Sequence, residues 1–257
     1  FSGRPLEGRS VAMLFEKPSL RTKVSFDVGV HEFGGHAIHL SKDEIDMDGR
    51  EPVEDIASVL EQFVSLIVAR VNSHRSLERL AERASVPVIN ALSDVEHPCQ
   101  ALADIQTVRS KLGHLDGVKI AYVGDANNCA LSLGLACAAT GGRFAIASPG
   151  GYAFGDAEIA LITNRGKAPQ VTDDPREAVD GADVIYTDAW TSMGQEAEWA
   201  QRKADFQGFQ VNDELLSGAT PGALIMHPMP VHYGEEMPTW MLDHPQSVAY
   251  LQAGNRL

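Results

Sequence analysis

The sequence of 257 residues has few cysteines and no long hydrophobic run. Its three cysteines are scattered and do not form the paired framework of a disulfide-stapled domain. Residues 1–9 lack the charged-then-apolar order of a secretion signal. The most apolar stretch, residues 129–139, is shorter than the roughly 20 helical residues that cross a bilayer. We therefore expect a protein of the reducing cytoplasm with no membrane segment.

Positive charge is also scarce. The chain has 21 Lys and Arg against 35 Asp and Glu, which gives a formal charge of −14. An acidic chain repels phosphate backbones at long range, and no basic run offsets this locally. We therefore expect no nucleic-acid partner. The hydrophobic share of 44% and charged share of 22% are ordinary for a globular protein, which excludes disorder as the main state.

Short β-branched runs alternate with amphipathic stretches, a pattern typical of parallel strands joined by crossover helices. The predicted strands cover residues 11–15, 36–40, 66–70, 86–90, 119–123, 143–148, 184–187 and 223–226. The predicted helices cover about 21–34, part of 53–63, 77–84, 98–111 and 129–140. The predicted fold class is α/β, with two doubly wound parallel-sheet domains joined by a long interdomain helix.

Polar side chains crowd the end of the first predicted strand. Residues 15–23 read FEKPSLRTK and place hydroxyl groups and cationic groups at a helix start. Such groups, together with the N–H groups at a helix amino end, are suited to bind phosphate. An N-capped helix with a solvated basic turn fits the same residues, and both interpretations stay open.

Two further residues fit an anion site or an ordinary structural role. Arg70 closes a predicted apolar strand, where it is a surface charge or an anion ligand. His97 begins the predicted linking helix, with Gln100 one turn later, where it is a packing or capping residue or part of a site.

Three later segments follow predicted strands, where open α/β sheets bind ligands. Residues 124–128, GDANN, lack the G-x-G-x-x-G glycines of a dinucleotide loop, so we expect no nucleotide. Asp188 offers a carboxylate for an ammonium group, and the two prolines in residues 227–230, HPMP, fix the direction of backbone carbonyls. Each segment alone also fits a plain loop.

Two apparent metal motifs fail. Residues 31–36, HEFGGH, miss the zinc-protease spacing by one residue. Residues 44–55 imitate a calcium loop but begin with Glu, contain Pro52 and end in Asp instead of a bidentate Glu. We expect no metal.

Taken in order, these segments resemble the transcarbamylase family, and most closely its ornithine carbamoyltransferases. Residues 19–23, SLRTK, resemble the family's S-T-R-T-R loop, and residues 97–100, HPCQ, resemble H-P-x-Q. Residues 125–128, DANN, resemble D-G-N-N, and residues 188–194, DAWTSMG, resemble D-x-W-x-S-M-G. The resemblance covers nearly the whole chain and implies a homotrimer that needs no cofactor.

The resemblance implies a role for each matched residue. The residues implied for carbamoyl phosphate are Ser19, Leu20, Arg21, Thr22, Arg70, His97, Gln100, Pro228, Met229 and Arg256. Those implied for ornithine are Asn128, Asp188, Ser192 and Met193. Within the first set, Arg70, His97, Thr22 and Pro228 are the implied catalytic residues. The implied domains are residues 1–112 for carbamoyl phosphate, 113–240 for the amino acid, and 241–257 returning toward the first domain.

Several positions depart from the ornithine-type pattern. Leu20 replaces a Thr of the phosphate loop, and Lys23 replaces an Arg. Pro228 replaces a Cys. A proline at this position, and a glycine at the position of Gly254, resemble the pattern of the aspartate carbamoyltransferases. Asp46 stands where the family places a neutral or imidazole side chain that reaches a neighbouring subunit's phosphate, and its carboxylate would repel that phosphate unless paired or turned away.

Three functions stay open at this point. The first is carbamoyl transfer to ornithine, which gives citrulline in arginine metabolism. The second is a transcarbamylase with another amine acceptor, favoured by Pro228 and Gly254. The third is a catalytically retired member that acts as a binding or assembly subunit, favoured by Leu20, Asp46 and Pro228.

Overall fold

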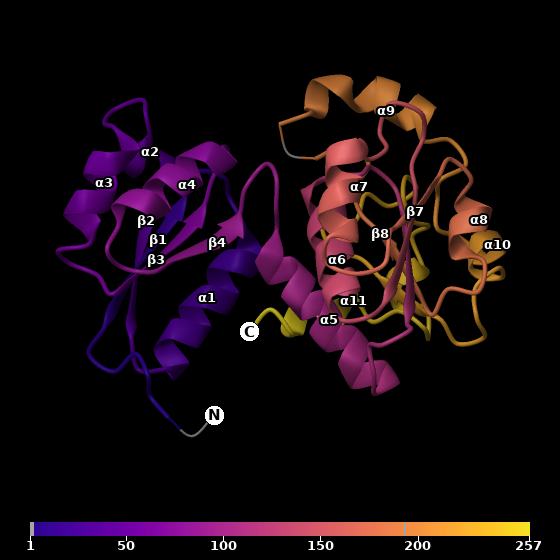
Figure 1. The fold of residues 1–257 in the computed structure, drawn as a ribbon, viewed down its shortest axis with the longest axis horizontal. Helices are drawn as coiled ribbons and strands as arrows, with labels where there is room; N and C mark the ends of the chain where they lie inside the picture. The colour runs from indigo at the N-terminus through magenta and orange to yellow at the C-terminus, as the bar shows by residue number, and fades with distance from the viewer. Residues whose placement is uncertain (1–2, 193) are drawn as a thin grey trace. The chain divides into compact units, whose positions relative to one another are not determined.

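The computed structural model describes residues 3–192 and 194–257, and the chain divides into two compact units. The first unit is Phe1–Cys99 with Arg256–Leu257, and the second is Gln100–Asn255. Each unit is a parallel sheet with helices on its faces (Figure 1). The predicted fold class, two parallel-sheet α/β domains, is therefore confirmed.

The first unit contains a four-stranded sheet of order β2-β1-β3-β4. Alternate residues of β1 pack on opposite faces: Val11 and Met13 pack with α1, whereas Ala12 and Leu14 pack with α3 and α4. The elements are β1 (Ser10–Phe15), α1 (Leu20–Glu32), β2 (His36–Ser41), α2 (Lys42–Ile45), α3 (Val53–Leu60), β3 (Leu66–Arg70), α4 (His74–Arg83) and β4 (Val88–Leu92).

The second unit contains a five-stranded sheet of order β7-β6-β5-β8-β9. Ile120 and Tyr122 of β5 pack toward α5, α6 and α7, while Ala121 and Val123 pack toward α8, α9 and α10. The elements are α5 (Pro98–Leu112), β5 (Lys119–Val123), α6 (Asn128–Ala139), β6 (Arg143–Ala147), α7 (Asp156–Thr163), β7 (Gln170–Thr172), α8 (Pro175–Val179), β8 (Val184–Thr187), η1 (Glu196–Glu198), α9 (Trp199–Asp205), α10 (Asp213–Leu216), β9 (Leu224–Met226), η2 (Met241–Asp243) and α11 (Ala249–Gly254).

Some elements differ from the sequence prediction. The fourth strand begins at Val88, two residues later than predicted, because Pro87 has no N–H to donate to a ladder. Pro87 still accepts a hydrogen bond from the backbone N–H of Ile67 through its carbonyl (3.0 Å). The short elements α2, α7 and β7 were not predicted. The division between the units falls between Cys99 and Gln100, inside α5, and the predicted boundary after residue 112 stays a prediction.

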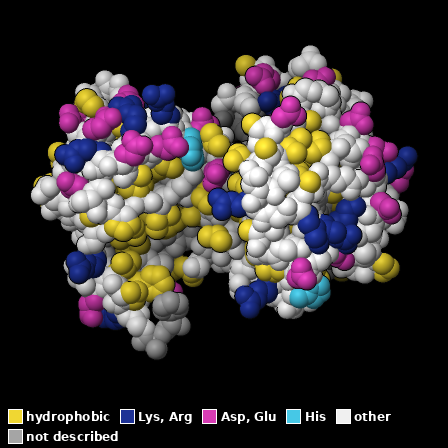
Figure 2. Space-filling model, in the orientation of Figure 1, with side chains coloured by type: hydrophobic (Ala, Val, Ile, Leu, Met, Phe, Trp, Pro, Cys, Tyr) yellow, Lys and Arg dark blue, Asp and Glu magenta, His cyan; other side chains and the backbone are white. Residues whose placement is uncertain are grey.

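The outer face of α1 is apolar. Leu20, Val24 and Val28 lie four residues apart and are all exposed, Leu20 most of all at 74%. The space-filling view shows hydrophobic side chains gathered over this helix (Figure 2). The other side of α1 packs on β1, so α1 is hydrophobic on two sides. Its apolar residues are therefore less confined to one face of the helix than those of α4. Among the described residues, no helix combines the length and hydrophobicity needed to span a bilayer.

Candidate active site

The sheet order of the first unit brings two predicted site segments together. The chain leaves β1 toward β2 on one side and returns to β3 on the other, so the carboxyl ends of β1 and β3 lie at a topological switch point. Phe15 is in register with Arg70, and the N–H of Glu16 donates to the carbonyl of Arg70 (2.9 Å). Arg70 therefore lies beside the loop that leads into Ser19.

The predicted phosphate loop forms the amino end of α1. Ser19 is the N-cap, and its hydroxyl accepts from the N–H of Thr22 (3.3 Å). Arg21 and Thr22 lie in the first turn, where backbone N–H groups have no partner within the helix. Leu20 is exposed, so the residue that departs from the family motif points to solvent. The loop thus keeps its helix geometry despite this substitution.

A buried histidine of the first unit lies beside Arg256 and is influenced by the charges of two further arginines. His97 is 6% exposed, and burial lowers its pKa well below the ordinary value, with further lowering by Arg256, Arg70 and Arg21. Arg256 Nη1 lies 3.5 Å from His97 Nε2, and Arg256 Nη2 donates to the hydroxyl of Thr22 (2.9 Å). A neutral imidazole influenced by three guanidinium charges is a site that favours an anion.

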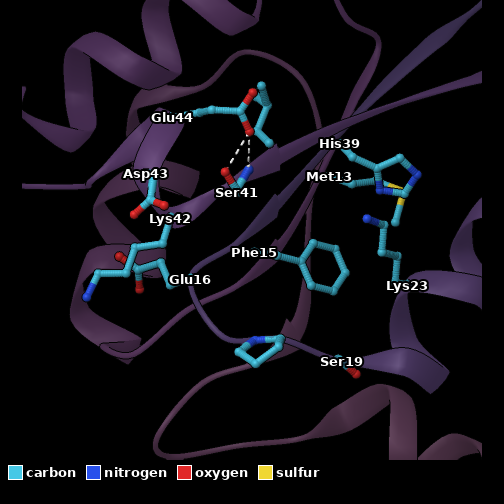
Figure 3. Close-up of a pocket in the computed structure, with 12 residues that line it drawn as sticks. Met13, Phe15, Glu16, Ser19, Lys23, His39, Ser41, Lys42, Asp43 and Glu44 are labelled. Carbon is cyan, nitrogen blue, oxygen red and sulfur yellow. Dashed lines mark hydrogen bonds between the residues drawn. The ribbon is translucent and has the colours of Figure 1, made fainter.

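A pocket of about 530 Å³ lies on the same unit (Figure 3). Of the predicted site residues, Ser19 alone lines it within the described part of the chain, together with Lys23 of the same loop. On its other side, the carboxylate of Glu44 accepts from the N–H and the hydroxyl of Ser41 (both 2.7 Å). The pocket therefore shares Ser19 with the predicted phosphate loop, and neither Arg70 nor His97 lines it.

Asp46 ends α2 in the left-handed conformation, with a φ of 30°. Its carboxylate packs against Gly49, where an added Cβ would collide with it. Asp and Asn tolerate this backbone conformation better than other non-glycine residues do. The acid at this position therefore also has a local structural reason.

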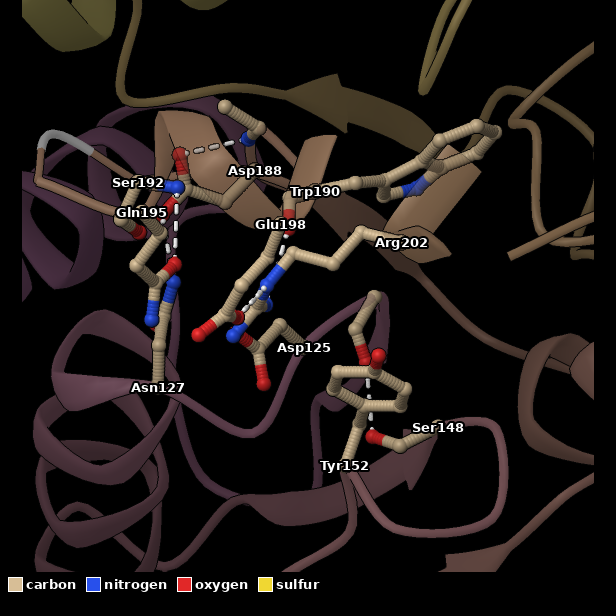
Figure 4. A network of polar contacts seen from close by, with 12 residues as sticks. Asp125, Asn127, Ser148, Tyr152, Asp188, Trp190, Ser192, Gln195, Glu198 and Arg202 are labelled. Atoms are coloured by element: carbon tan, nitrogen blue, oxygen red, sulfur yellow. Dashed lines mark hydrogen bonds and ion pairs between the residues drawn. The ribbon is translucent and has the colours of Figure 1, made fainter. Parts of the chain in front are cut away.

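The second unit has its own switch point, between β5 and β8, where Asn127 and Asp188 meet (Figure 4). Asn127 Oδ1 caps α6 by accepting from the N–H groups of Cys129 (2.9 Å) and Ala130 (3.1 Å). Its Nδ2 donates to Asp188 Oδ2 (3.0 Å), and the N–H of Ala189 donates to Asp188 Oδ1 (2.8 Å). Asp188 remains partly exposed, so its carboxylate is held in place and still open to a ligand.

An ion pair ties the two loops of this switch point together. Arg202 donates to Asp125 (2.8 Å), to Glu198 (2.8 Å) and to the carbonyl of Trp190 (3.0 Å), and its guanidinium lies over the ring of Tyr152 at 5.0 Å. Burial raises the pKa of Asp125, and Arg202 opposes that rise. Because both side chains of the pair are nearly buried, it fixes the segment after Asp188 to the loop before α6.

Two of the other residues predicted for the amino acid lie in the segments that follow β5 and β8. Asn128 is the first residue of α6, directly after the cap. Ser192 is half-buried, and its N–H donates to Gln195 Oε1 (3.0 Å). Met193 lies outside the described residues.

The segment after β9 is shaped by a buried histidine. The N–H of Met229 donates to His227 Nδ1 (2.8 Å), so Nε2 carries the proton and donates to Glu236 Oε1 (3.1 Å). The same oxygen of Glu236 accepts from the N–H of His232 (2.6 Å). Met229 has a φ of 60°. These bonds hold Pro228 and Met229 in one backbone conformation and so fix their carbonyl directions.

Sequence reasoning missed the residues that hold the predicted ones in place. Arg202, Glu236 and Asp104 each bond to a predicted site residue or to its loop, and Asn127, known from the sequence only as part of the DANN motif, bonds to Asp188. Asp104 offered a signal, because it lies four residues after Gln100, on the same side of the predicted helix. Arg202 and Glu236 offered none, because the contacts that tie them to the site loops are with Asp125, 77 residues from Arg202, and with backbone atoms at Trp190 and His232.

Polar side chains at the switch points of two parallel sheets, one set cationic and one built on a carboxylate, define a two-domain α/β enzyme. Residues 2–110 match the family "Aspartate/ornithine carbamoyltransferase, carbamoyl-P binding domain". Residues 116–257 match "Aspartate/ornithine carbamoyltransferase, Asp/Orn binding domain". The chain belongs to the aspartate/ornithine carbamoyltransferase family.

Individual relatives resemble the chain over its whole length. It is 49% identical to an ornithine carbamoyltransferase of Acidothermus cellulolyticus over 262 aligned residues, covering 100% of this chain and 84% of the relative. The structure of ornithine carbamoyltransferase from Pyrococcus furiosus matches with a TM-score of 0.95 at 46% identity. The match covers 99% of this chain and 83% of the Pyrococcus chain. A structure of an N-acetyl-L-ornithine transcarbamylase variant matches with a TM-score of 0.88 at 25% identity. This match covers 99% of this chain and 87% of the other.

Proposed function

We propose that this protein transfers the carbamoyl group of carbamoyl phosphate to the δ-amine of L-ornithine, giving L-citrulline and phosphate. The observation that carries the proposal is the buried His97 with Arg256 beside it (3.5 Å), where Arg256 also donates to Thr22 of the phosphate loop (2.9 Å) and Arg70 and Arg21 add further positive charge. A phosphate dianion offsets the mutual repulsion of these guanidinium groups. The similarity to ornithine carbamoyltransferases over the full chain supports the choice of substrates.

In this proposal the first unit binds the phosphate and polarises the carbonyl. Ser19, Arg21, Thr22 and Arg256 bind phosphate oxygens together with the N–H groups of the first turn of α1, to which Leu20 contributes its backbone only. Arg70, His97 and Thr22 donate to the carbamoyl oxygen as negative charge develops on it. His97 suits this role because its lowered pKa keeps the imidazole neutral. A neutral imidazole still has one N–H that can donate a hydrogen bond.

The carbamoyl amide is recognised by acceptors in the proposal. Gln100 accepts from the amide through its side-chain oxygen, and Pro228 and Met229 offer backbone carbonyls in directions fixed by His227. Carbonyl oxygens match the two N–H groups of a carbamoyl group.

The second unit binds ornithine in the proposal. Asn128 takes the carboxylate, and Asp188 takes the α-ammonium group together with Ser192 and Met193. Asp188 suits an ammonium group because its carboxylate is partly exposed and held by Asn127. The neutral δ-amine then forms the new C–N bond, the C–O bond to phosphate breaks, and the proton of the amine leaves with phosphate. Positioning and charge stabilisation suffice for this reaction without a cofactor or metal.

The remaining parts of the proposal concern organisation. We propose residues 1–112 as the carbamoyl phosphate domain, residues 113–240 as the amino-acid domain and residues 241–257 as the return to the first, to which Arg256 and Leu257 belong. A homotrimer in the cytoplasm completes the proposal, and Cys99, Cys129 and Cys137, which form no disulfide in the described part of the chain, agree with a reducing compartment.

An acceptor panel tests the proposed activity. Purified protein is given carbamoyl phosphate with ornithine, N-acetylornithine or putrescine, and the carbamoylated product is quantified. We expect product with ornithine, and a rise of about 10- to 100-fold in its KM for Asp188→Asn, because a charged hydrogen bond contributes about 1.5–3 kcal/mol. Asp173→Asn, at an exposed carboxylate of the same unit, is the matched control. Ornithine turnover unchanged by Asp188→Asn would contradict the role of this carboxylate.

A second candidate is a transcarbamylase with another amine acceptor. Pro228 and Gly254 favour it, as does the structural match to an N-acetyl-L-ornithine transcarbamylase. A larger kcat/KM with one of the other two amines would favour this candidate. Binding of carbamoyl phosphate without turnover of any amine would favour a retired, binding member of the family.

A further inference from the structure

Asp104 is a buried carboxylate in the second unit that no part of the proposed mechanism uses. It lies on α5 at 1% exposure, one turn after Gln100. Gln100 Nε2 and Gln252 Nε2 both donate to its Oδ1, at 2.8 Å and 2.7 Å. The hydroxyl of Tyr186 donates to its Oδ2 (3.0 Å). Three donors on two oxygens stabilise an ionised carboxylate at this depth.

The donors around Asp104 have fixed directions. The backbone N–H of His227 donates to Gln252 Oε1 (2.9 Å), so the Gln252 amide must turn its NH₂ group toward Asp104. Burial and the charge of Asp104 raise the pKa of Tyr186, so its hydroxyl keeps the proton that it donates. The hydroxyl of Tyr186 and the NH₂ groups of Gln100 and Gln252 therefore all donate to Asp104, and Gln252 Nε2 donates in addition to the hydroxyl oxygen of Tyr186 (3.2 Å).

This direction decides which end of the Gln100 amide faces the carboxylate. A carboxylate accepts hydrogen bonds and donates none, so it pairs with the NH₂ end of an amide and repels the carbonyl end. Gln100 is 2% exposed and cannot exchange its partner for solvent. Its NH₂ group is thus held at Asp104, and its other end is a carbonyl oxygen, which accepts hydrogen bonds.

We propose that Asp104 is a positioning residue that makes the protein selective for a carbamoyl group by fixing Gln100 with its side-chain oxygen as the acceptor. The inference rests on the proposed function, in which Gln100 binds the carbamoyl amide. A carbamoyl group offers N–H donors to this oxygen, whereas the methyl group of acetyl phosphate offers none. Through Gln252, the same carboxylate holds the backbone at His227, where the segment of Pro228 and Met229 begins.

The test uses Asp104→Asn in the full chain. Asparagine has nearly the same shape but offers one donor and one acceptor group, so it pairs with the Gln100 amide in either orientation. Calorimetry measures the Kd of carbamoyl phosphate, acetyl phosphate and inorganic phosphate. We expect the ratio of the acetyl phosphate Kd to the carbamoyl phosphate Kd to fall by about 3- to 10-fold, the range of one neutral hydrogen bond. The Kd of inorganic phosphate should change by less than about twofold, because phosphate lacks the group that Gln100 reads.

Tyr186→Phe is the matched control. It removes the hydrogen bond to Asp104 Oδ2 and leaves the hydrogen bonds from Gln100 and Gln252 to Asp104 Oδ1 in place. A merely structural role of the network would change the ratio in both variants, whereas we expect the ratio to change in Asp104→Asn alone. Gln100→Leu, which removes the acceptor, gives the full loss of selectivity for comparison.

A neutron crystal structure of the wild-type protein tests the same point without any variant that could fail to fold. We expect two deuterons on the Gln100 atom nearest Asp104, and a carbonyl oxygen at that place would overturn the inference. In the binding experiment, an unchanged ratio in Asp104→Asn overturns the inference while the proposed function stands. Failure of the wild-type protein to bind carbamoyl phosphate overturns both.

Discussion

Replacing Arg70 by Met separates anion binding from stability. Arg70 is 5% exposed at the carboxyl end of β3, and its charge adds to that of Arg256 and Arg21 around His97. At a separation of about 4 Å and an effective dielectric constant of about 20, one unit charge interacts with another by about 4 kcal/mol. Part of this is offset by the cost of removing both groups from water, so we expect a net loss of about 2–4 kcal/mol on substitution. Carbamoyl phosphate should therefore bind roughly 30- to 700-fold more weakly.

The stability of the ligand-free protein should respond differently. Methionine keeps the apolar part of the side chain and removes the repulsion from the neighbouring guanidinium groups, so the free energy of unfolding should change by less than about 1 kcal/mol. Calorimetry gives the Kd, and urea unfolding gives the stability. Arg75→Met, an exposed arginine of α4 in the same unit, is the control and should alter neither quantity. A Kd for Arg70→Met within about threefold of the wild-type value would refute the assignment, because even a modest charged hydrogen bond exceeds that change.

Three further predictions follow from the same contacts. Because the pKa of His97 lies well below its ordinary value of 6.5, the unfolded chain binds a proton at acidic pH that the folded chain does not. The free energy of unfolding should therefore fall by up to about 1.4 kcal/mol per pH unit below about pH 6.5. Urea unfolding of His97→Gln should lack this part of the pH dependence. A slope unchanged in that variant would contradict the buried, neutral state. Asp46→Gln should tighten carbamoyl phosphate binding in calorimetry if Asp46 opposes the phosphate; unchanged affinity would remove that role. Asn127→Ala should lower stability by about 1 kcal/mol through loss of the α6 cap, and should raise the KM for ornithine while leaving the carbamoyl phosphate Kd unchanged, because Asp188 loses a hydrogen bond. An equal change in both substrate constants would argue against this positioning role.

The sequence predicted the sheets and the strand ends well, because each strand is a short buried run bounded by turn residues. The central strands β1, β3, β5 and β8 fall within a residue of the predicted bounds. The edge strand β7 and the single turn of α2 were not predicted. Neither contains the continuous buried run that marks the equally short β8 and β9. The position of β4 depends on Pro87, whose missing N–H acts only once a neighbouring strand is present.

The candidate site was predicted in part for a similar reason. Arg70 and the Ser19 loop could be placed together from strand ends alone, since both follow strands of one parallel sheet. The contact of Arg256 with Thr22 spans 234 residues, and no local pattern encodes it. The family resemblance alone pointed to Arg256. Positioning residues such as Asp104 and Asn127 are recognised only from the direction of their hydrogen bonds, which requires coordinates.

Carbon-13 NMR of the reaction tests the central claim most directly. Carbamoyl phosphate labelled at its carbon is mixed with ornithine and the protein, and the label is followed over time together with released phosphate. We predict that the label moves to the ureido carbon of citrulline in a one-to-one ratio with phosphate, and that Arg70→Met slows this transfer by about 100-fold or more. Folded protein that binds carbamoyl phosphate yet leaves citrulline unlabelled would contradict the account.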